Sequence, residues 1–218
     1  MMSPASLSLN PQTLADRLAW EGARNSLRFN PELAYGRHRG PAPTTARRAA
    51  VLIALWREAD EWFVALTLRQ SNLSRHRGQV SFPGGYIDPG ETSSVAAVRE
   101  FSEETGCDQI PQLLGSLPEC YVYVSDTVVT PWVGLLTMPP QWTPNPAEVE
   151  RMITVPVGSL VGDSFIHNHT VKRDSLEFTA PCYRFGDIDV WGATAIILDT
   201  FVSTTIIDHE AAAHSRHV

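Results

Sequence analysis

The sequence predicts a domain of the α/β (α+β) class, in which strands and helices pack in layers. Residues 49–55 (AAVLIAL) form a continuous apolar run of strand length, and after an acidic turn residues 62–68 form a second one, which together indicate a hairpin. Residues 92–105 have the spacing of a helix, and a further helix with one apolar side is expected to begin near Trp191. A mixture of strands with two such helices favours the layered class over an all-helical or all-strand fold.

The remaining elements follow in chain order. Asn10 and Pro11 are typical of a helix cap followed by proline at the first helical position, and Leu14 and Leu18 begin an apolar stripe behind them. Residues 36–48 are rich in proline, glycine and arginine, which predicts a linker.

These boundaries divide the chain into three parts. We expect an N-terminal extension over residues 1–46, one domain over residues 47–205 and a tail over residues 206–218. Within the domain, residues 121–124 and 128–136 are predicted as further strands.

Composition limits the classes of function. The 218 residues are 43% hydrophobic and 19% charged, as in ordinary globular proteins, and the net charge of −7 argues against a general binder of nucleic acid or anionic membranes. No stretch reaches the about 20 apolar residues of a membrane span, and the first residues lack a signal peptide pattern. Three scattered cysteines fit neither a disulfide framework nor a zinc site. A cytoplasmic location with small buried thiols is therefore expected.

Three carboxylates are predicted to share one face of the helix over residues 92–105. Glu100, Glu103 and Glu104 stand at positions i, i+3 and i+4, which stacks their side chains. Ala96 and Ala97 fall on the same face, and their small size is expected to leave room for an ion and a substrate.

The opposite face is predicted to be the buried one. Val95, Val98 and Phe101 supply an apolar stripe there, and Gly106 is expected to end the helix.

Like charges on one helical face repel, so the arrangement favours a bound cation, and hard divalent ions prefer carboxylate oxygens. The alternative is a solvated acidic surface. Gly84, Gly85 and Gly90 precede the helix and allow the main chain to approach a ligand closely, which favours the site. Arg99 lies four residues before Glu103 and can orient it.

At this point the segment resembles the Nudix hydrolase motif, which combines a glycine, a glutamate and an Arg-Glu-apolar-any-Glu-Glu-any-Gly-apolar run at fixed spacing. The matching residues are Gly85, Glu91, Arg99, Glu100, Phe101, Glu103, Glu104, Gly106 and Cys107. The resemblance implies a mixed β-sheet sandwiched between helices and hydrolysis of a phosphate–phosphate bond with Mg²⁺ or Mn²⁺.

The same resemblance assigns roles to individual residues. Glu100 and Glu104 would be the principal metal ligands and Glu103 an additional one, while Glu91 would pair with Arg99 to brace the loop against the helix. Cys107 would then be a core residue.

A cationic cluster precedes the glycine loop and suggests where a phosphorylated substrate would bind. An arginine-rich loop can also be a solvated surface. Residues 66–85 and 189–198 resemble the coenzyme A pyrophosphatase branch of the Nudix hydrolases, with Gln70 and Ser74 departing from its pattern. The predicted substrate-binding residues are Arg69, Arg75, His76, Arg77, Gly84 and Gly85.

Hydrolysis also needs a group that accepts the proton of the attacking water. Glu148 matches a glutamate that many Nudix domains carry before their last core strand, although it can equally be a surface residue. Glu103 is the competing candidate.

The leading hypothesis is a coenzyme A diphosphatase that releases 3′,5′-ADP and 4′-phosphopantetheine. A pyrophosphatase for ADP-ribose or another dinucleotide is the alternative enzyme, and a nucleotide-sensing module without catalysis is the alternative of another class. All three take a small nucleotide as partner, with no nucleic acid and no membrane. The sequence leaves open whether the chain is a monomer or a homodimer.

Overall fold

The hairpin that the two apolar runs predict opens the main sheet of the computed structural model. Strand β1 spans Arg47–Glu58 and β2 spans Glu61–Arg69, and the two turn residues between them have positive φ. Leu55 lies opposite Val64 in the antiparallel register, so the pair buries apolar side chains along most of its length.

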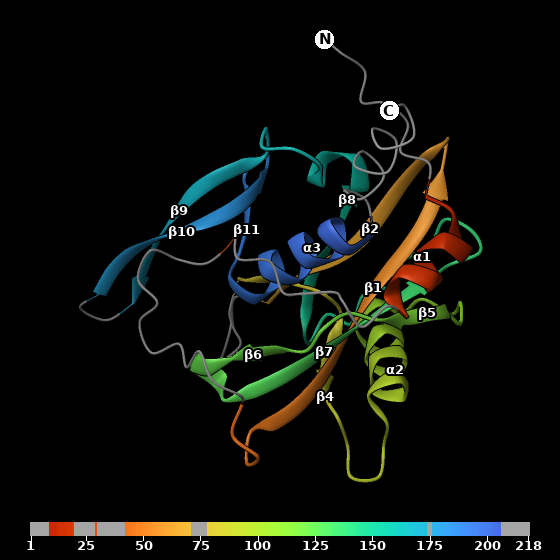
Figure 1. Cartoon of the computed structure of the whole chain (residues 1–218), viewed down its shortest axis with the longest axis horizontal. Coiled ribbons are helices and arrows are strands. Elements are labelled where there is room, and N and C mark those ends of the chain that lie inside the picture. The colour runs from red at the N-terminus through yellow and green to blue at the C-terminus, as the bar shows by residue number, and fades with distance from the viewer. Residues whose placement is uncertain (1–8, 20–28, 30–41, 71–77, 174–175, 206–218) are drawn as a thin grey trace, which may run out of the picture.

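The structure describes residues 9–19, 29, 42–70, 78–173 and 176–205. Figure 1 shows their arrangement. The helices are α1 (Pro11–Leu18), α2 (Ser93–Thr105) and α3 (Gly192–Thr205), with two short 3₁₀ turns, η1 (Tyr123–Ser125) and η2 (Val157–Leu160). The other strands are β3 (Val80–Ser81), β4 (Gly84–Tyr86), β5 (Gln112–Ser116), β6 (Cys120–Val122), β7 (Thr127–Leu135), β8 (Val149–Pro156), β9 (Ile166–Arg173), β10 (Leu176–Phe185) and β11 (Ile188–Trp191).

The large sheet is mixed. Its strands follow the order β3-β2-β1-β7-β5, and β4, β6 and β8 pair with β1, β7 and β2 respectively. Strands β1 and β7 run parallel, and the other pairs are antiparallel. A separate antiparallel sheet has the order β11-β10-β9, and β11 leads into α3.

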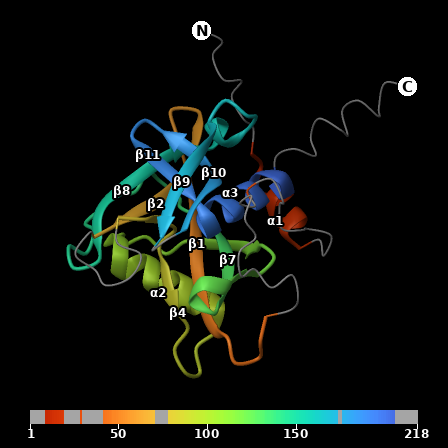
Figure 2. The ribbon, with the colours of Figure 1, turned by 90° about the vertical axis from the view of Figure 1, so that its left-hand side faces the viewer.

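Helices cover both faces of the large sheet. Along β1 the side chains alternate, so that Leu52 faces the buried cluster beneath α2 while Ile53 faces the cluster beneath α1 and α3. Figures 1 and 2 show α2 on one side of the sheet and α1 with α3 on the other. The expected mixed sheet sandwiched between helices is therefore confirmed.

Helix α2 lies where the sequence predicts it, but its buried face was predicted only in part: Phe101 is buried as expected. Val95 is 55% exposed, whereas Ala96 and Ala97 are fully buried and pack with Phe101 against the sheet. Small side chains let the helix lie close to β1, where Ala50 is also fully buried. The two alanines therefore pack in the core and do not leave room for an ion.

The other predicted helices and strands are present in the structure, but some of them begin or end at different residues. The side chain of Asn10 accepts hydrogen bonds from the N–H groups of Gln12 and Thr13, which confirms the predicted cap of α1. Strand β6 ends at Val122, because the chain turns into η1 where the sequence predicted strand to continue. No helix in the described part of the chain is long and apolar enough to cross a membrane.

Candidate active site

The three glutamates of helix α2 are buried to different extents. Thr92 caps its first turn, and Gly106 ends it in the left-handed conformation with φ of 62°. The side chain of Glu104 is 2% exposed and that of Glu103 is 58% exposed, with Glu100 between them. The carboxylates therefore form a gradient from the core to the surface.

Two glycines of β4 bring the main chain against these carboxylates. The N–H of Gly84 donates a hydrogen bond to Oε2 of Glu104 at 3.2 Å. A Cβ atom at position 85 would lie only 2.4 to 2.6 Å from the carboxylate atoms of Glu100, so Gly85 is required for this approach. Both glycines, predicted to bind substrate, thus contact the predicted metal ligands.

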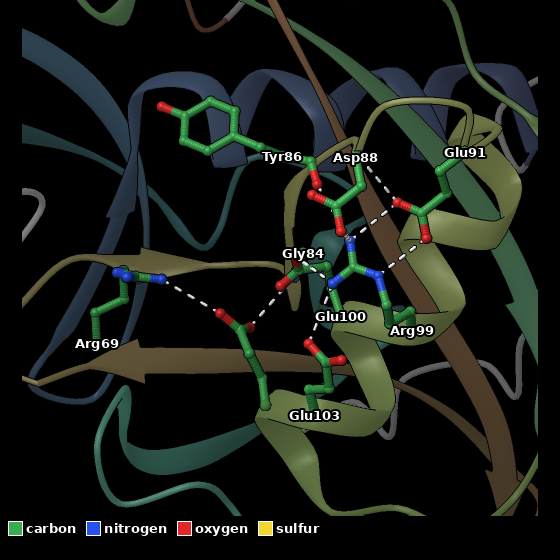
Figure 3. A network of polar contacts seen from close by, with 9 residues as sticks. Arg69, Gly84, Tyr86, Asp88, Glu91, Arg99, Glu100 and Glu103 are labelled. Carbon is green, nitrogen blue, oxygen red and sulfur yellow. Dashed lines mark hydrogen bonds and ion pairs between the residues drawn. The ribbon is translucent and has the colours of Figure 1, made fainter.

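Arg99 joins the preceding loop to the helix. Its Nε and Nη2 donate to the two oxygens of Glu91 at 2.9 and 3.0 Å, and its Nη1 donates to Glu100 at 2.8 Å and to Glu103 at 3.1 Å. Nη2 also donates to the carbonyl oxygen of Tyr86 at 3.2 Å. Figure 3 shows this network, which fixes the loop on the helix as the motif implies. The hydrogen bonds from Arg99 lower the pKa of Glu91.

Burial sets the protonation of the deeper carboxyls. Desolvation raises the pKa of Glu104 to about 7, against the opposing effects of Arg69 and the N–H of Gly84. Desolvation also raises the pKa of Glu100, although Arg99 opposes the shift. Both groups therefore carry negative charge at a cost that a neighbouring cation would relieve.

Glu148 lies at the same cluster because its loop docks on the end of α2. The N–H groups of Thr143 and Asn145 donate at 2.9 Å to the last carbonyl groups of the helix. The charge of Glu148 contributes to the raised pKa values of Glu100 and Glu104, which places it near both. The sequence prediction grouped these residues, and the structure brings them together.

Gln70 also holds this loop by hydrogen bonds, which the sequence did not reveal. Its side-chain amide donates to the carbonyl oxygen of Pro146 at 3.1 Å, and its N–H donates to that of Glu148 at 2.9 Å. The only sign in the sequence was that Gln70 departs from the pattern of the branch it resembles.

The predicted cationic cluster is described in part. Nη1 of Arg69 lies 3.3 Å from Oε1 of Glu104, so this arginine faces the carboxylates. Arg75, His76 and Arg77 lie outside the described residues. Cys107, predicted as a core residue, is buried, and burial raises the pKa of its thiol.

The donor set fits a hard divalent cation. Oxygen atoms of Glu100, Glu103 and Glu104 line one helical face, and the deeper carboxyls are destabilised as anions by burial. Within the described ranges, however, no three acidic, histidine or cysteine side chains converge as a formed metal site. Arg99 pairs with Glu100 and Glu103, and Arg69 pairs with Glu104, so binding an ion would require these side chains to rotate.

The chain is similar in sequence to several Nudix hydrolases. The chain is 30% identical over 146 residues to the peroxisomal coenzyme A diphosphatase NUDT7 of Mus musculus, covering 66% of this chain and 61% of that protein. It is 34% identical over 157 residues to the mitochondrial coenzyme A diphosphatase NUDT8 of Homo sapiens, covering 69% and 66%. It is 36% identical over 154 residues to the uncharacterized Nudix hydrolase NudL of Photorhabdus laumondii, covering 70% and 81%.

The chain thus spans somewhat less than two thirds of the mouse and human relatives. The family model of the NUDIX domain matches residues 46–169, which contain the whole carboxylate helix, both glycines and Glu148. The chain belongs to the Nudix hydrolase family.

Proposed function

We propose that this hydrolase cleaves the pyrophosphate of coenzyme A or its derivatives, giving 3′,5′-ADP and 4′-phosphopantetheine. The observation that carries the proposal is the contact of Glu100 and Glu104 with the glycine strand, with the charge of Glu148 acting on both. Two relatives named coenzyme A diphosphatases support the choice of substrate. A cytoplasmic location belongs to the same proposal.

Mg²⁺ or Mn²⁺ would be held by Glu100 and Glu104, with Glu103 as an additional ligand. When bound, such an ion neutralises charge on the pyrophosphate and acidifies water. Arg99 contacts Glu100 and Glu103 and is the residue that keeps them in place beside β4. The salt bridge from Arg69 to Glu104 would open, which frees its guanidinium for a phosphate oxygen.

Water attacks one phosphorus, the bridging phosphorus–oxygen bond breaks, and the proton of the water passes to a carboxylate. We assign this proton to Glu148 in preference to Glu103. Arg99 donates to Glu103 at 3.1 Å, whereas no described residue donates a hydrogen bond to the Glu148 carboxylate. A carboxylate that accepts no hydrogen bond from the described residues is open to one from the attacking water.

The test is a panel of coenzyme A, acyl coenzyme A, ADP-ribose and NADH, assayed with Mg²⁺ or Mn²⁺ for release of phosphate monoesters. We expect coenzyme A or an acyl derivative to have the highest kcat/KM, with no turnover after the metal is chelated. If ADP-ribose or NADH gives the highest value, the assignment of coenzyme A is wrong. Binding without turnover in either metal would favour a sensing module.

A further inference from the structure

An aromatic side chain stands directly after the two glycines of the site. Tyr86 ends β4 and is 46% exposed. Successive side chains of a strand point to opposite faces, so Tyr86 points away from the α2 face that Gly85 occupies. Figure 3 shows its ring on the side of the strand away from Glu103, while its carbonyl oxygen accepts the hydrogen bond from Arg99.

A guanidinium group covers one side of this ring. Arg47 begins β1, two residues before Ala49, the partner of Tyr86 in the sheet, so both side chains lie on the same face. The guanidinium carbon lies 4.2 Å from the centre of the ring, which is the geometry of a cation–π contact.

Arg47 differs from the other arginines around the site because it has no ion pair with a described acidic side chain. Arg69 and Arg99 are paired with carboxylates of the catalytic cluster, and Arg48 is paired with Glu119. Arg47 instead donates to the carbonyl oxygen of Ser125 at 3.4 Å, and no acidic side chain of the described residues forms an ion pair with it. An exposed cation without a carboxylate partner is suited to an anionic ligand.

We infer that Tyr86 and Arg47 form the subsite for the adenosine 3′-phosphate half of the substrate. The adenine base stacks on the exposed part of the Tyr86 ring, and the guanidinium of Arg47 binds the 3′-phosphate. This inference rests on the proposed function, since coenzyme A carries both groups on one ribose. An aromatic side chain beside arginine is a combination that binds nucleotides in many proteins.

The place of Tyr86 next to Gly85 in β4 supports the same assignment of the subsite. The strand rises about 3.3 Å per residue, so Tyr86 is one short step along β4 from the main chain that touches Glu100 and Glu104. Because the ring lies on the opposite face of the strand, the nucleoside of a pyrophosphate bound at the carboxylates would pass around β4 to stack on it. Arg99 holds the main chain of Tyr86 close to Glu100, because its guanidinium donates to the carbonyl oxygen of Tyr86 and to the carboxylate of Glu100.

The experiment measures each half of the substrate separately by calorimetry, with 3′,5′-ADP and 4′-phosphopantetheine as probes. Tyr86→Ala should weaken binding of 3′,5′-ADP at least about 5-fold, the lower range for loss of one stacked base, and leave 4′-phosphopantetheine unchanged. Tyr86→Phe keeps the ring and should restore the affinity. In turnover of coenzyme A, Tyr86→Ala should raise KM while kcat is retained.

Arg47 is tested through the 3′-phosphate. The wild-type protein should bind 3′,5′-ADP more tightly than 5′-AMP, and Arg47→Gln should remove that preference. Met138→Ala, at a residue that is 60% exposed in the loop after β7, is the surface control. Thermal melting of each variant verifies that it is folded.

Unchanged 3′,5′-ADP affinity in folded Tyr86→Ala, or an equal loss for both probes, would overturn the subsite. That result would leave coenzyme A hydrolysis by the wild-type protein untouched. Conversely, absence of coenzyme A turnover together with a selective loss of 3′,5′-ADP binding would refute the proposed function and retain the subsite. The two failures are therefore distinguishable.

Discussion

Glu104 combines the deepest burial on the carboxylate face with contacts from two separate strands. Its side chain is 2% exposed, Gly84 donates to one oxygen and Arg69 lies by the other. Burying a carboxylate costs free energy unless its partners compensate. Desolvation outweighs these partners and raises the pKa of Glu104, as burial does for carboxyls in many functional sites.

Glu104→Gln should therefore lower kcat by at least about 10²-fold, the scale of losing one stabiliser of the transition state. The amide keeps the shape of the side chain, so we expect the variant to fold. Steady-state turnover with Mg²⁺ and Mn²⁺ checks the loss, and circular dichroism checks the fold. Glu150→Gln, at an exposed glutamate of β8, is the matched control. Near-normal turnover in a folded Glu104→Gln protein would contradict the metal-ligand assignment.

Much of the site could be predicted at the level of residues, because the spacing of local contacts is fixed by helical geometry. Glu100, Glu103 and Glu104 share a face for this reason, and Arg99 reaches Glu103 at i+4. The sequence identified Gly84 as part of the site, but not its hydrogen bond to Glu104, which depends on how β4 pairs with β1. The local sequence does not determine that pairing, because the two strands are far apart in the chain.

At the level of elements, apolar runs and helical spacing identified β1, β2, α2 and α3, since each has a strong pattern of its own. The second sheet was not predicted. Strand β9 has the sequence IHNHTVKR, in which polar residues predominate, and its hydrogen bonds are made with β10. The buried face of α2 was predicted correctly for Phe101 but not for Val95, because helical spacing alone does not specify which side meets the sheet.

The loop between β7 and β8 carries Glu148, and Gln70, the residue directly after β2, holds this loop by two hydrogen bonds. Gln70→Ser removes the side-chain bond to Pro146 and leaves the main-chain bond. We expect kcat to fall roughly 2- to 10-fold, the worth of one hydrogen bond, with little change in KM. The pH dependence of kcat should shift as well, because the position of Glu148 relative to Glu100 changes.

Kinetics across pH on the purified variant tests this role for Gln70. Gln141→Ser, at an exposed glutamine outside this contact, is the control and should behave as wild type. A higher KM with unchanged kcat would show that Gln70 contacts substrate and does not position the loop. Gln70→Ser introduces one of the residues that the coenzyme A branch has at this position, so the result also measures what the departure does.

At the scale of the whole molecule, a few polar contacts join the helices and the two sheets across the two hydrophobic clusters. The hydroxyl of Thr194 in α3 donates to the carbonyl oxygen of Val80 in β3 at 3.0 Å. Nη1 of Arg17 in α1 donates a hydrogen bond to the carbonyl oxygen of Thr205, at the end of α3, at 2.7 Å. Helix α3 therefore connects the N-terminal helix, the small sheet and the strand that precedes the glycine loop.

The small sheet has its own charged centre, which should make its contribution to stability depend on pH. Asp189 in β11 accepts from Arg184 in β10 at 2.5 and 2.7 Å and lies 2.9 Å from Nδ1 of His169 in β9. The ring of His169 also stacks on Trp191. Hydrogen bonds from Arg184, followed by that from His169, lower the pKa of Asp189 to about 2. One carboxylate thus bonds all three strands.

A carboxyl whose pKa is lower in the folded protein stabilises the fold above its unfolded pKa, here 3.8, and loses that effect as pH falls toward about 2. Asp189→Asn should therefore reduce the free energy of unfolding by about 1 kcal/mol at pH 6, a value kept small by solvent screening. The difference from wild type should shrink between pH 4 and pH 2. Urea unfolding at pH 6, 4 and 3 measures it.

Asp187→Asn is the matched control in the same hairpin, because Asp187 is 87% exposed and lies 3.9 Å from Arg151. It should leave stability unchanged at every pH. If Asp189→Asn costs the same at pH 6 and pH 3, the effect comes from packing or hydrogen-bond geometry, since the charge of Asp189 would then contribute nothing that titrates. A cost that grows as the pH falls would contradict the lowered pKa itself.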